Sequence, residues 1–249
     1  MFKALIARLK QGHRTTPWPD GPAPELPERF AGRPRLDASR CRDGCAACAA
    51  VCPTGALSGG ALDLGRCLFC RACVEACPER AVEFTREPAM AARRREDLVV
   101  RGGAYRLAEA LEAESRRVFG RSLKLRQVSA GGCNACESDL NVLGTIGWDL
   151  GRFGVQFVAS PRHADGLLVT GPVTANMREA LLKTWAAVPS PKLVIAAGAC
   201  AISGGPYRGR PEAHDGCGQL LPVDLFIPGC PPHPLTTLDG ILRLLGRLG

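Results

Sequence analysis

The sequence predicts two units of different class: a small α+β unit, followed by a larger α/β unit with a mainly parallel sheet. Three observations lead to this division. Eight cysteines fall within residues 41–85, in two copies of one motif. From residue 123 onward, short runs rich in Val, Leu and Ile alternate with helix-prone stretches, a pattern typical of a parallel sheet covered on both faces. A charged stretch at residues 93–119 separates the two patterns.

Composition agrees with a folded chain of one or two domains. The 249 residues are 46% hydrophobic and 22% charged, which is ordinary for globular proteins. We expect an N-terminal helix and proline-rich arm at residues 1–30, the cysteine-rich unit at 31–90, a linker helix at 91–122 and the α/β unit at 123–249.

The N-terminal helix is expected to be amphipathic. Phe2, Leu5, Ile6 and Leu9 share one helical face, and Lys3, Arg8 and Lys10 lie elsewhere on the helix. The apolar face can dock on the chain's own body, or on a membrane surface or a neighbouring subunit, and the pattern leaves both open. Six prolines then favour an extended arm: Pro17, Pro19, Pro22, Pro24, Pro27 and Pro34.

Cysteine usage indicates metal ligation. No apolar run reaches the roughly 18 to 20 residues that span a bilayer, and the start lacks a secretory or twin-arginine signal, so we expect a cytoplasmic location. Thiol buffers there keep disulfides open. The thirteen cysteines are therefore better explained as metal ligands than as disulfides.

The net charge of +8 is confined to the first half of the chain. Up to and including Arg126 there are 23 Lys and Arg against 15 Asp and Glu, and beyond it 9 against 9. Such a basic half suits an anionic membrane surface or an acidic protein. With two Tyr and three Trp in the whole chain, stacking on single-stranded nucleic acid is disfavoured, so no nucleic acid partner is expected.

Two interleaved cysteine motifs predict a two-cluster ferredoxin domain over residues 31–90. The second motif is Cys-x2-Cys-x2-Cys-x3-Cys-Pro, in which the fourth cysteine ligates the other cluster, and the first has one extra residue in its first gap. Gly44 can absorb that extra residue, although a three-iron cluster stays possible. A zinc pair is the alternative, but it does not explain the interleaving. The expected ligand sets are Cys41, Cys45, Cys48 and Cys77 for cluster 1, and Cys52, Cys67, Cys70 and Cys73 for cluster 2.

A third set of cysteines follows the predicted strands of the second unit. In an open, flavodoxin-like α/β sheet, loops from separate strands converge beyond the carboxyl ends of the strands. Glycines beside these cysteines, at positions 131, 132, 198 and 229, allow close backbone approach to a bulky group. The sequence therefore predicts a third four-iron cluster on Cys133, Cys136, Cys200 and Cys230.

Both units resemble known families. Residues 30–85 resemble the ferredoxin-like subunits of complex I and formate hydrogenlyase. Residues 127–242 resemble the small, cluster-bearing subunit shared by complex I (its 20 kDa subunit) and the group 4, membrane-bound nickel-iron hydrogenases, through the strings RFGVQFVASPRHADGLLVTGPVT, GACAISGGPY and PVDLFIPGCPPHP. Complex I members carry adjacent cysteines at the first site, whereas Cys133-Asn134-Ala135-Cys136 resembles the hydrogenase branch. The two subunits are usually separate chains, and here they are fused.

This resemblance implies an electron-transfer subunit of a membrane-associated oxidoreductase complex, with no catalytic residue of its own. The implied partners are a hydrogenase-like or complex I-like large subunit, integral membrane subunits, and an external electron donor or acceptor protein. The chain would then be peripheral on the inner face of the cell membrane. Two alternatives stay open: a hydrogenase-related or quinone-reducing complex without nickel, and a zinc-stabilised scaffold without redox function.

Several other residues are candidates for a role at or near the clusters. Cys217 is expected to be a small buried side chain and no ligand. Glu137 follows a ligand, where it can hydrogen-bond near the cluster or cap the next helix. Arg162 can raise the potential of the cluster or form a structural ion pair. The three histidines His163, His214 and His233 are not needed as ligands, because twelve cysteines already make three sets of four.

Overall fold

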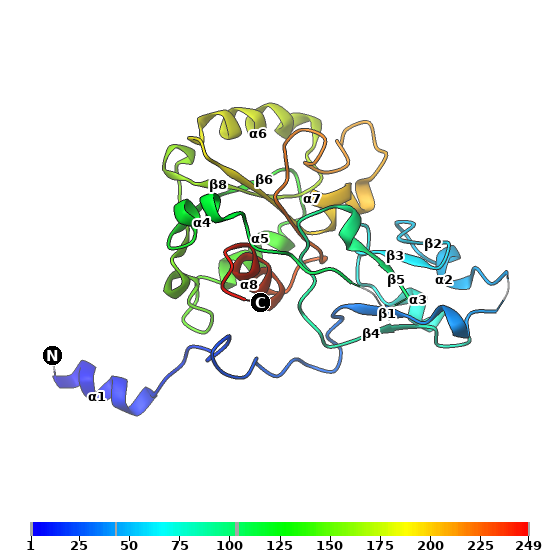
Figure 1. Cartoon of the computed structure of the whole chain (residues 1–249), viewed down its shortest axis with the longest axis horizontal. Helices are drawn as coiled ribbons and strands as arrows, with labels where there is room; N and C mark the ends of the chain where they lie inside the picture. The colour runs from blue at the N-terminus through cyan, green and yellow to red at the C-terminus, as the bar shows by residue number, and fades with distance from the viewer. Residues whose placement is uncertain (1, 43, 103–104, 249) are drawn as a thin grey trace.

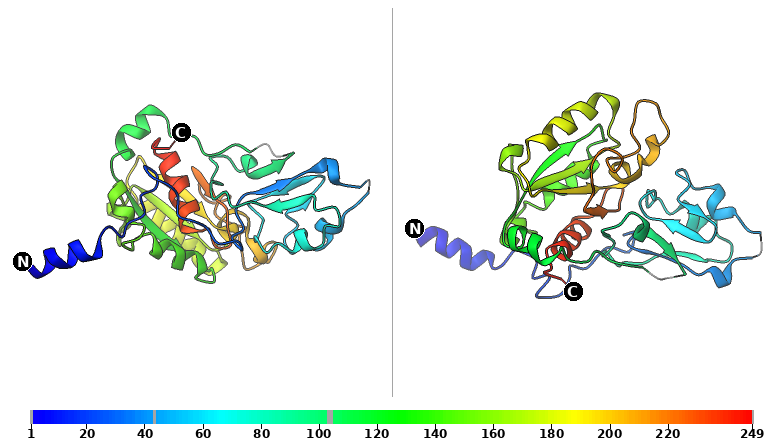
Figure 2. Two further views of the ribbon diagram at one scale, coloured as in Figure 1. Left: turned by 90° about the horizontal axis from the view of Figure 1, so that it is seen from below. Right: turned by 45° about the horizontal axis from the view of Figure 1, so that its top comes forward.

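In a computed structural model, which describes residues 2–42, 44–102 and 105–248, the chain forms two lobes (Figure 1). The larger lobe surrounds a five-stranded sheet, and the smaller lobe consists of short strands and single-turn helices. The N-terminal helix projects away from both lobes, as all the views show (Figures 1 and 2).

The smaller lobe is built on a structural repeat. Helices α2 (Ala47–Ala50) and α3 (Ala72–Glu75) begin 25 residues apart, the same offset as the two cysteine motifs, and they contact each other. Strand β1 (Pro34–Leu36) pairs antiparallel with β4 (Val82–Phe84). This pairing closes the lobe, because it joins the segment before the first motif to the segment after the second.

A second antiparallel sheet flanks the repeat. Its strands are β2 (Leu57–Ser58), β3 (Ala61–Asp63) and β5 (Val99–Arg101), in that order. In the register of β3 with β5, Leu62 lies opposite Val100, and both side chains are buried at 1% exposure. Strand β5 therefore adds a third strand to the small lobe from beyond its expected boundary.

The structure corrects the expectation of one linker helix over residues 91–122. Among the described residues of this segment, α-helix is confined to α4 (Ala113–Phe119). Val99 and Val100 are β-branched and fit a pleated sheet better than a helix. The strand forms because β3 offers an open edge, a contact distant in sequence that local charge and propensity do not reveal.

The larger lobe contains the predicted parallel sheet. Its strands are β6 (Leu123–Ser129), β7 (Val155–Phe157), β8 (Gly166–Thr170), β9 (Leu193–Ala197) and β10 (Leu225–Ile227). The order across the sheet is β10-β9-β8-β6-β7, and every pairing is parallel. Numbered from the first strand of the lobe and read from its opposite edge, this is the flavodoxin-like order 2-1-3-4-5, so that prediction is confirmed.

Both faces of the sheet are buried. Its helices are α5 (Ala135–Val142), α6 (Ala175–Ala187), α7 (Ala199–Ser203) and α8 (Pro234–Leu244). Leu168 faces the core shared with α5 and α8, whereas Leu167 and Val169 face the core shared with α6. This second core continues into the smaller lobe through Leu62 and Leu98, so the two lobes share one packed interior.

Short 3-10 turns complete the fold. They are η1 (Ala38–Arg40), η2 (Glu96–Leu98), η3 (Leu150–Phe153), η4 (Pro161–His163) and η5 (Gly205–Tyr207).

The N-terminal arm runs along both lobes. After α1 (Phe2–Gln11), the backbone N–H of Thr16 donates to the Gly147 carbonyl at 2.8 Å, and Arg152 donates to the Thr16 carbonyl at 2.8 Å. Farther on, the N–H of Gly32 donates to the Thr85 carbonyl of the smaller lobe. In the part of the chain that the structure describes, no helix combines the length and apolar character needed to cross a bilayer.

Candidate metal centres

The first hollow lies at the outer end of the smaller lobe. Cys48 reaches it from α2, Cys77 from the turn after α3, and Cys41 and Cys45 from the loop after η1. Cys41 and Cys45 are exposed, whereas Cys48 and Cys77 are partly buried. Gly44 has a φ of +73°, so the extra residue of the first motif is taken up at a position where glycine is favoured.

The second hollow is deeper. It is lined by Cys67, Cys70 and Cys73 of the second motif and by Cys52 of the first, the interleaving that the spacing predicts. Burial raises the pKa of the Cys67 thiol to about 12, and burial together with neighbouring thiols raises that of Cys73 to about 11. A metal cation bound in such a site would displace the protons of these thiols, because metal ligation requires the thiolate.

Backbone donors point at the sulfurs in both motifs. The N–H of Ala56 donates to Cys52 Sγ at 3.2 Å, and the N–H of Ala81 donates to Cys77 Sγ at 3.2 Å. The two bonds are equivalent under the 25-residue repeat, since each joins a cysteine to the residue four positions later. N–H donors favour the thiolate and tune the potential of a metal group bound to it.

The third hollow lies beyond the carboxyl ends of the parallel strands. Cys133 and Cys136 follow β6, Cys200 lies in α7 after β9, and Cys230 follows β10. Burial is the largest cause that raises the pKa values of Cys136 and Cys200 to about 12. The structure thus brings the four cysteines of the third predicted set together from three separate strand ends.

Glycines hold the backbone against these sulfurs. A Cβ added at Gly198 would lie 2.7 Å from Cys136 Sγ, and one added at Gly205 would lie 2.9 Å from Cys200 Sγ. Of the four glycines singled out in the sequence, Gly198 alone has a cysteine sulfur among its nearest neighbours. Gly205 was missed because it lies five residues after its cysteine, and only the tight α7–η5 turn brings the two together.

Strained backbone collects at the cysteine loops. Phe69 and Arg71 of the second motif, Arg80 shortly after it, and Asn134 between the third-set cysteines all have φ between +49° and +70°. Each such non-glycine residue costs on the order of 1–3 kcal/mol and persists where surrounding structure fixes it, which is common at ligand-binding sites. Only Asn134 could have been anticipated, since Asn tolerates this conformation better than most residues.

Glu137 is part of the third hollow. It lines the cavity, is 7% exposed, and accepts a hydrogen bond from Thr170 Oγ1 at 2.6 Å. Burial alone would raise the pKa of Glu137, but hydrogen bonds from Ser129 and Thr170 hold it below its ordinary value. Its carboxylate thus ties the start of α5 to the end of β8, a contact that the sequence did not reveal.

Neighbouring hollows lie close to each other. The Cys48 thiol of the first hollow contributes to the raised pKa of Cys73 in the second, and Cys70 of the second contributes, after burial and Cys133, to the raised pKa of Cys230 in the third. Such electrostatic influence requires proximity. The second hollow is therefore close to both of the others.

The remaining candidates lie outside the rims of these hollows. His233 caps α8, where its Nδ1 accepts from the Leu235 N–H at 3.1 Å, and its ring packs edge-on against Phe30 and Trp148. Arg162 and His163 are exposed on η4, and His214 is held through its backbone by Val173. Cys217 is fully buried in the core and lines none of the three hollows.

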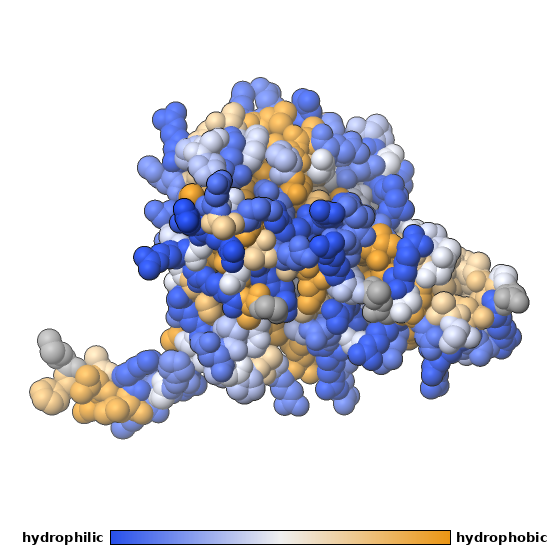
Figure 3. Space-filling view, viewed as in Figure 1, coloured by the Kyte–Doolittle hydropathy of each residue, from blue (hydrophilic) through white to orange (hydrophobic). Residues whose placement is uncertain are grey.

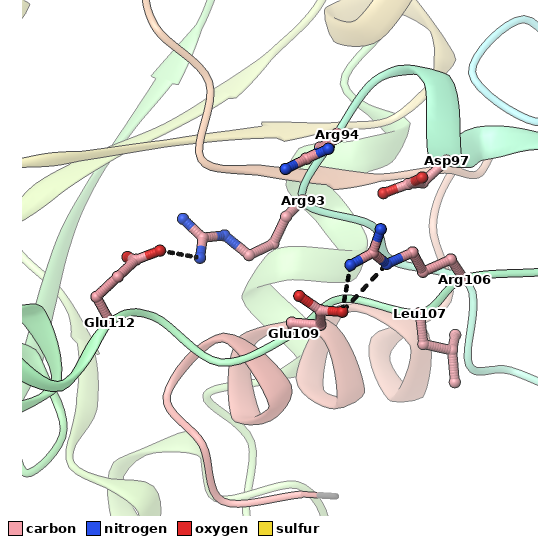
Figure 4. A pocket seen from close by; sticks show the side chains of 7 residues that line it. All are labelled: Arg93, Arg94, Asp97, Arg106, Leu107, Glu109 and Glu112. Carbon is pink, nitrogen blue, oxygen red and sulfur yellow. Dashed lines mark hydrogen bonds and ion pairs between the residues drawn. The ribbon is translucent and has the colours of Figure 1, made fainter.

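A separate hollow beside β5 is charged but contains no cysteine (Figure 4). Arg106 pairs with Glu109, and Arg93 pairs with Glu112 at 3.3 Å. With Arg94 and Asp97 included, three positive side chains face three negative ones, so the charges largely cancel within the site. We interpret this hollow as a structural brace for the segment before α4.

The donor sets suit a polynuclear iron-sulfur group. Each of the three hollows is lined by four cysteines that come from separate turns and helices. Among the described residues, no three His, Cys, Asp or Glu side chains are gathered as ligands of one metal ion. Four separated thiolates match a cluster in which each holds a different iron. Fold and cysteine geometry together define an iron-sulfur protein.

Comparison with known proteins places the chain in a family. The model of the NADH ubiquinone oxidoreductase 20 Kd subunit matches residues 133–244, and that of the 4Fe-4S binding domain matches residues 61–83. A probable membrane-bound hydrogenase subunit, mbhJ of Pyrococcus furiosus, is 41% identical over 136 residues, which are 55% of this chain and 81% of the relative. The chain belongs to the family of the 20 Kd subunit and carries a 4Fe-4S binding domain, so the resemblance seen in the sequence is confirmed.

Two further similarities complete the comparison. Formate hydrogenlyase subunit 7 of Escherichia coli is 42% identical over 138 residues, which are 55% of this chain and 54% of the relative. The matched region thus spans about half the length of that relative. A chain in the structure of the membrane-bound sulfane sulfur reductase, an archaeal respiratory membrane complex, shares 34% identity over 55% of this chain and 75% of its own length, with a TM-score of 0.47.

Proposed function

We propose that this chain is the electron-transfer subunit of a membrane-associated, hydrogenase-like oxidoreductase complex and holds three four-iron clusters. The single observation that carries the proposal is the distribution of twelve cysteines among three hollows, the second of which is close to both others. Cluster 1 would be held by Cys41, Cys45, Cys48 and Cys77, cluster 2 by Cys52, Cys67, Cys70 and Cys73, and cluster 3 by Cys133, Cys136, Cys200 and Cys230.

The exposure of the cysteines indicates which hollows a partner can approach. When bound, four-iron clusters accept and donate single electrons. Exposed Cys41 and Cys45 put the first hollow at the surface, where an external redox protein can approach. In the second hollow Cys67 and Cys73 are buried, whereas Cys70 is exposed. The third hollow, whose Cys133 and Cys230 are exposed, then offers a second outlet toward a large subunit that holds the catalytic centre.

The family and the names of the relatives support the proposed partners. One relative is a probable membrane-bound hydrogenase subunit and another is a formate hydrogenlyase subunit. We infer a hydrogenase-like large subunit against the third hollow and integral membrane subunits that keep the chain on the inner face of the cell membrane. Cys133 and Cys136, separated by two residues, support the hydrogenase branch over the complex I branch.

A cysteine exchange tests the partition of ligands. In Cys230→Ser, electron paramagnetic resonance of the reduced protein should lose the signal of cluster 3 and keep the coupled signals of the ferredoxin-like pair. Cys217→Ser is the matched control, because it makes the same exchange at a buried cysteine outside the hollows, and it should keep all signals. Loss of every signal in Cys230→Ser with a normal Cys217→Ser, or no loss at all, contradicts the partition.

The chemistry of the large subunit needs a separate experiment. The complex would be isolated through a tag on this chain and assayed for nickel and for hydrogen uptake. Nickel with hydrogen turnover supports the hydrogenase-like version. A complex without nickel and without turnover contradicts that version and leaves the cluster assignment in this chain untouched.

A further inference from the structure

Helix α1 presents an apolar face that contacts nothing in the described chain. Phe2, Leu5, Ile6 and Leu9 are 83%, 62%, 49% and 76% exposed, and no residue of Phe2–Gln11 is buried. In the space-filling view these side chains form a continuous hydrophobic surface on a helix that stands clear of the body (Figure 3). The sequence left two docking options open for this helix. The structure therefore does not show the first of them, docking on the chain's own domain.

The cations of α1 flank the apolar face. With about 100° between successive residues, Lys3 and Lys10 fall on one side of the apolar stripe and Arg8 falls on the other. The pole opposite the stripe consists of small or neutral residues, Ala4, Ala7 and Gln11. Long basic side chains at the two borders can reach past buried apolar groups toward phosphate headgroups.

The charge around α1 is of one sign. Lys3, Arg8 and Lys10 are followed by Arg14, and no Asp or Glu occurs before Asp20. Around this segment a protein partner would need an acidic, apolar groove of matching shape, whereas an anionic bilayer offers both properties over its whole surface.

The arm fixes where the helix leaves the body. Thr15 Oγ1 donates to the Ile146 carbonyl at 2.9 Å, and Thr16 and Trp18 are held through their carbonyls by Arg152. The Ile146 side chain at this anchor is itself 68% exposed. The root of α1 is therefore a fixed point on the larger lobe, next to a second exposed apolar side chain.

We propose that α1 lies in the interface of an anionic lipid membrane, with Phe2, Leu5, Ile6 and Leu9 inserted between the acyl chains and Lys3, Arg8 and Lys10 among the phosphates. The chain thus touches lipid itself, in addition to any attachment through partner subunits. This inference rests on the helix and its charges alone and is independent of the electron-transfer assignment.

Vesicle flotation of the purified full chain, with its clusters intact, tests the proposal. The chain should float with vesicles that contain phosphatidylglycerol and phosphatidylcholine, and it should float poorly with phosphatidylcholine alone. Leu9→Glu should weaken binding about tenfold or more, because it removes a buried leucine from the apolar face. Replacing Lys3, Arg8 and Lys10 by Gln should weaken binding by about tenfold or more and abolish the preference for anionic vesicles.

Val118→Glu is the matched control for Leu9→Glu. Val118 is an apolar residue on α4 with 53% exposure, so the same kind of exchange is made on a helix of the body. It should leave flotation unchanged. Because α1 buries nothing and Val118 is exposed, all variants should keep the iron content of the parent chain. Failure of the parent chain to bind anionic vesicles, or equal binding by Leu9→Glu, overturns the proposal and assigns α1 to a protein partner.

Discussion

Gly198 sets how closely the β9–α7 turn approaches the third hollow. Its φ is +91°, and an added Cβ would lie 2.7 Å from Cys136 Sγ. Gly198→Ala should therefore displace this sulfur and lower the iron content by about one cluster, or four irons per chain. Iron and acid-labile sulfide analysis of the purified variant measures this loss.

Gly209→Ala is the control that distinguishes the effect of the Cβ contact from the effect of the positive φ. Gly209 also has a positive φ, +71°, but an added Cβ would meet nothing within 4 Å. This control should keep its full iron content. If Gly198→Ala and Gly209→Ala lose iron equally, or neither loses any, the proximity of Gly198 to Cys136 is not what matters.

Thr236 offers a test of buried polarity. Its side chain is fully buried in α8, and its Oγ1 has no hydrogen-bond partner in the described chain. Thr236→Val removes an unsatisfied hydroxyl and keeps the shape, so it should stabilise the protein by about 1 kcal/mol. Thermal unfolding should then shift upward by about 2–4 °C. A downward shift of that size would mean that the hydroxyl is satisfied in solution.

At the residue scale, the sequence identifies chemistry better than contacts. The four cysteines of each expected set line one hollow, and their role as cluster ligands stays a prediction. The partners of Glu137 were not predictable, because Ser129 and Thr170 come from two different strands. The contact of Gly205 with Cys200 likewise depends on a turn whose tightness is set by the packing of α7.

One element holds the two lobes in register. Ser203 at the end of α7 donates its hydroxyl to the Gly65 carbonyl at 2.7 Å, and Gly65 precedes Cys67 of the second hollow. Ser203→Ala leaves that buried carbonyl without its donor, which should cost about 1–3 kcal/mol. We expect the unfolding temperature to fall by about 2–4 °C for each kcal/mol.

Thr184→Ala is the control for this interlobe bond. Thr184 Oγ1 donates to the Ala180 carbonyl at 2.7 Å within α6, and this hydrogen bond lies at the surface. Its removal should change the unfolding temperature by no more than a degree or so, since surface exchanges of this kind cost little. An equal effect of the two substitutions would show that the Ser203 bond contributes nothing specific to the joining of the lobes.

At the element scale, patterns in the sequence succeeded where packing agrees with local preference. Runs such as Leu193–Ala197, buried on both faces, predict parallel strands correctly. Strand β5 was missed, because its partner β3 lies almost forty residues earlier and the charges around it favour helix. The single-turn helices α2 and α3 are too short to show periodicity, and the cysteine motif alone indicates where they lie.

At the scale of the whole molecule, the lobes act as one scaffold. The core of the smaller lobe is continuous with the α6 face of the sheet. The second and third hollows meet across the boundary between the lobes, where Cys70 lies close to Cys230. A fused chain fixes this junction, and no partner subunit is needed to align the second and third hollows. The sequence predicts both lobes but not their contact, which depends on surfaces far apart along the chain.

The metal content of the anaerobically purified chain tests the central claim most directly. Three four-iron clusters predict about twelve iron atoms and about twelve acid-labile sulfides per chain, with little zinc. A value near eight irons per chain would mean that the chain holds two clusters and not three. A colourless protein that contains zinc and neither iron nor sulfide would contradict the proposal that this chain holds iron-sulfur clusters.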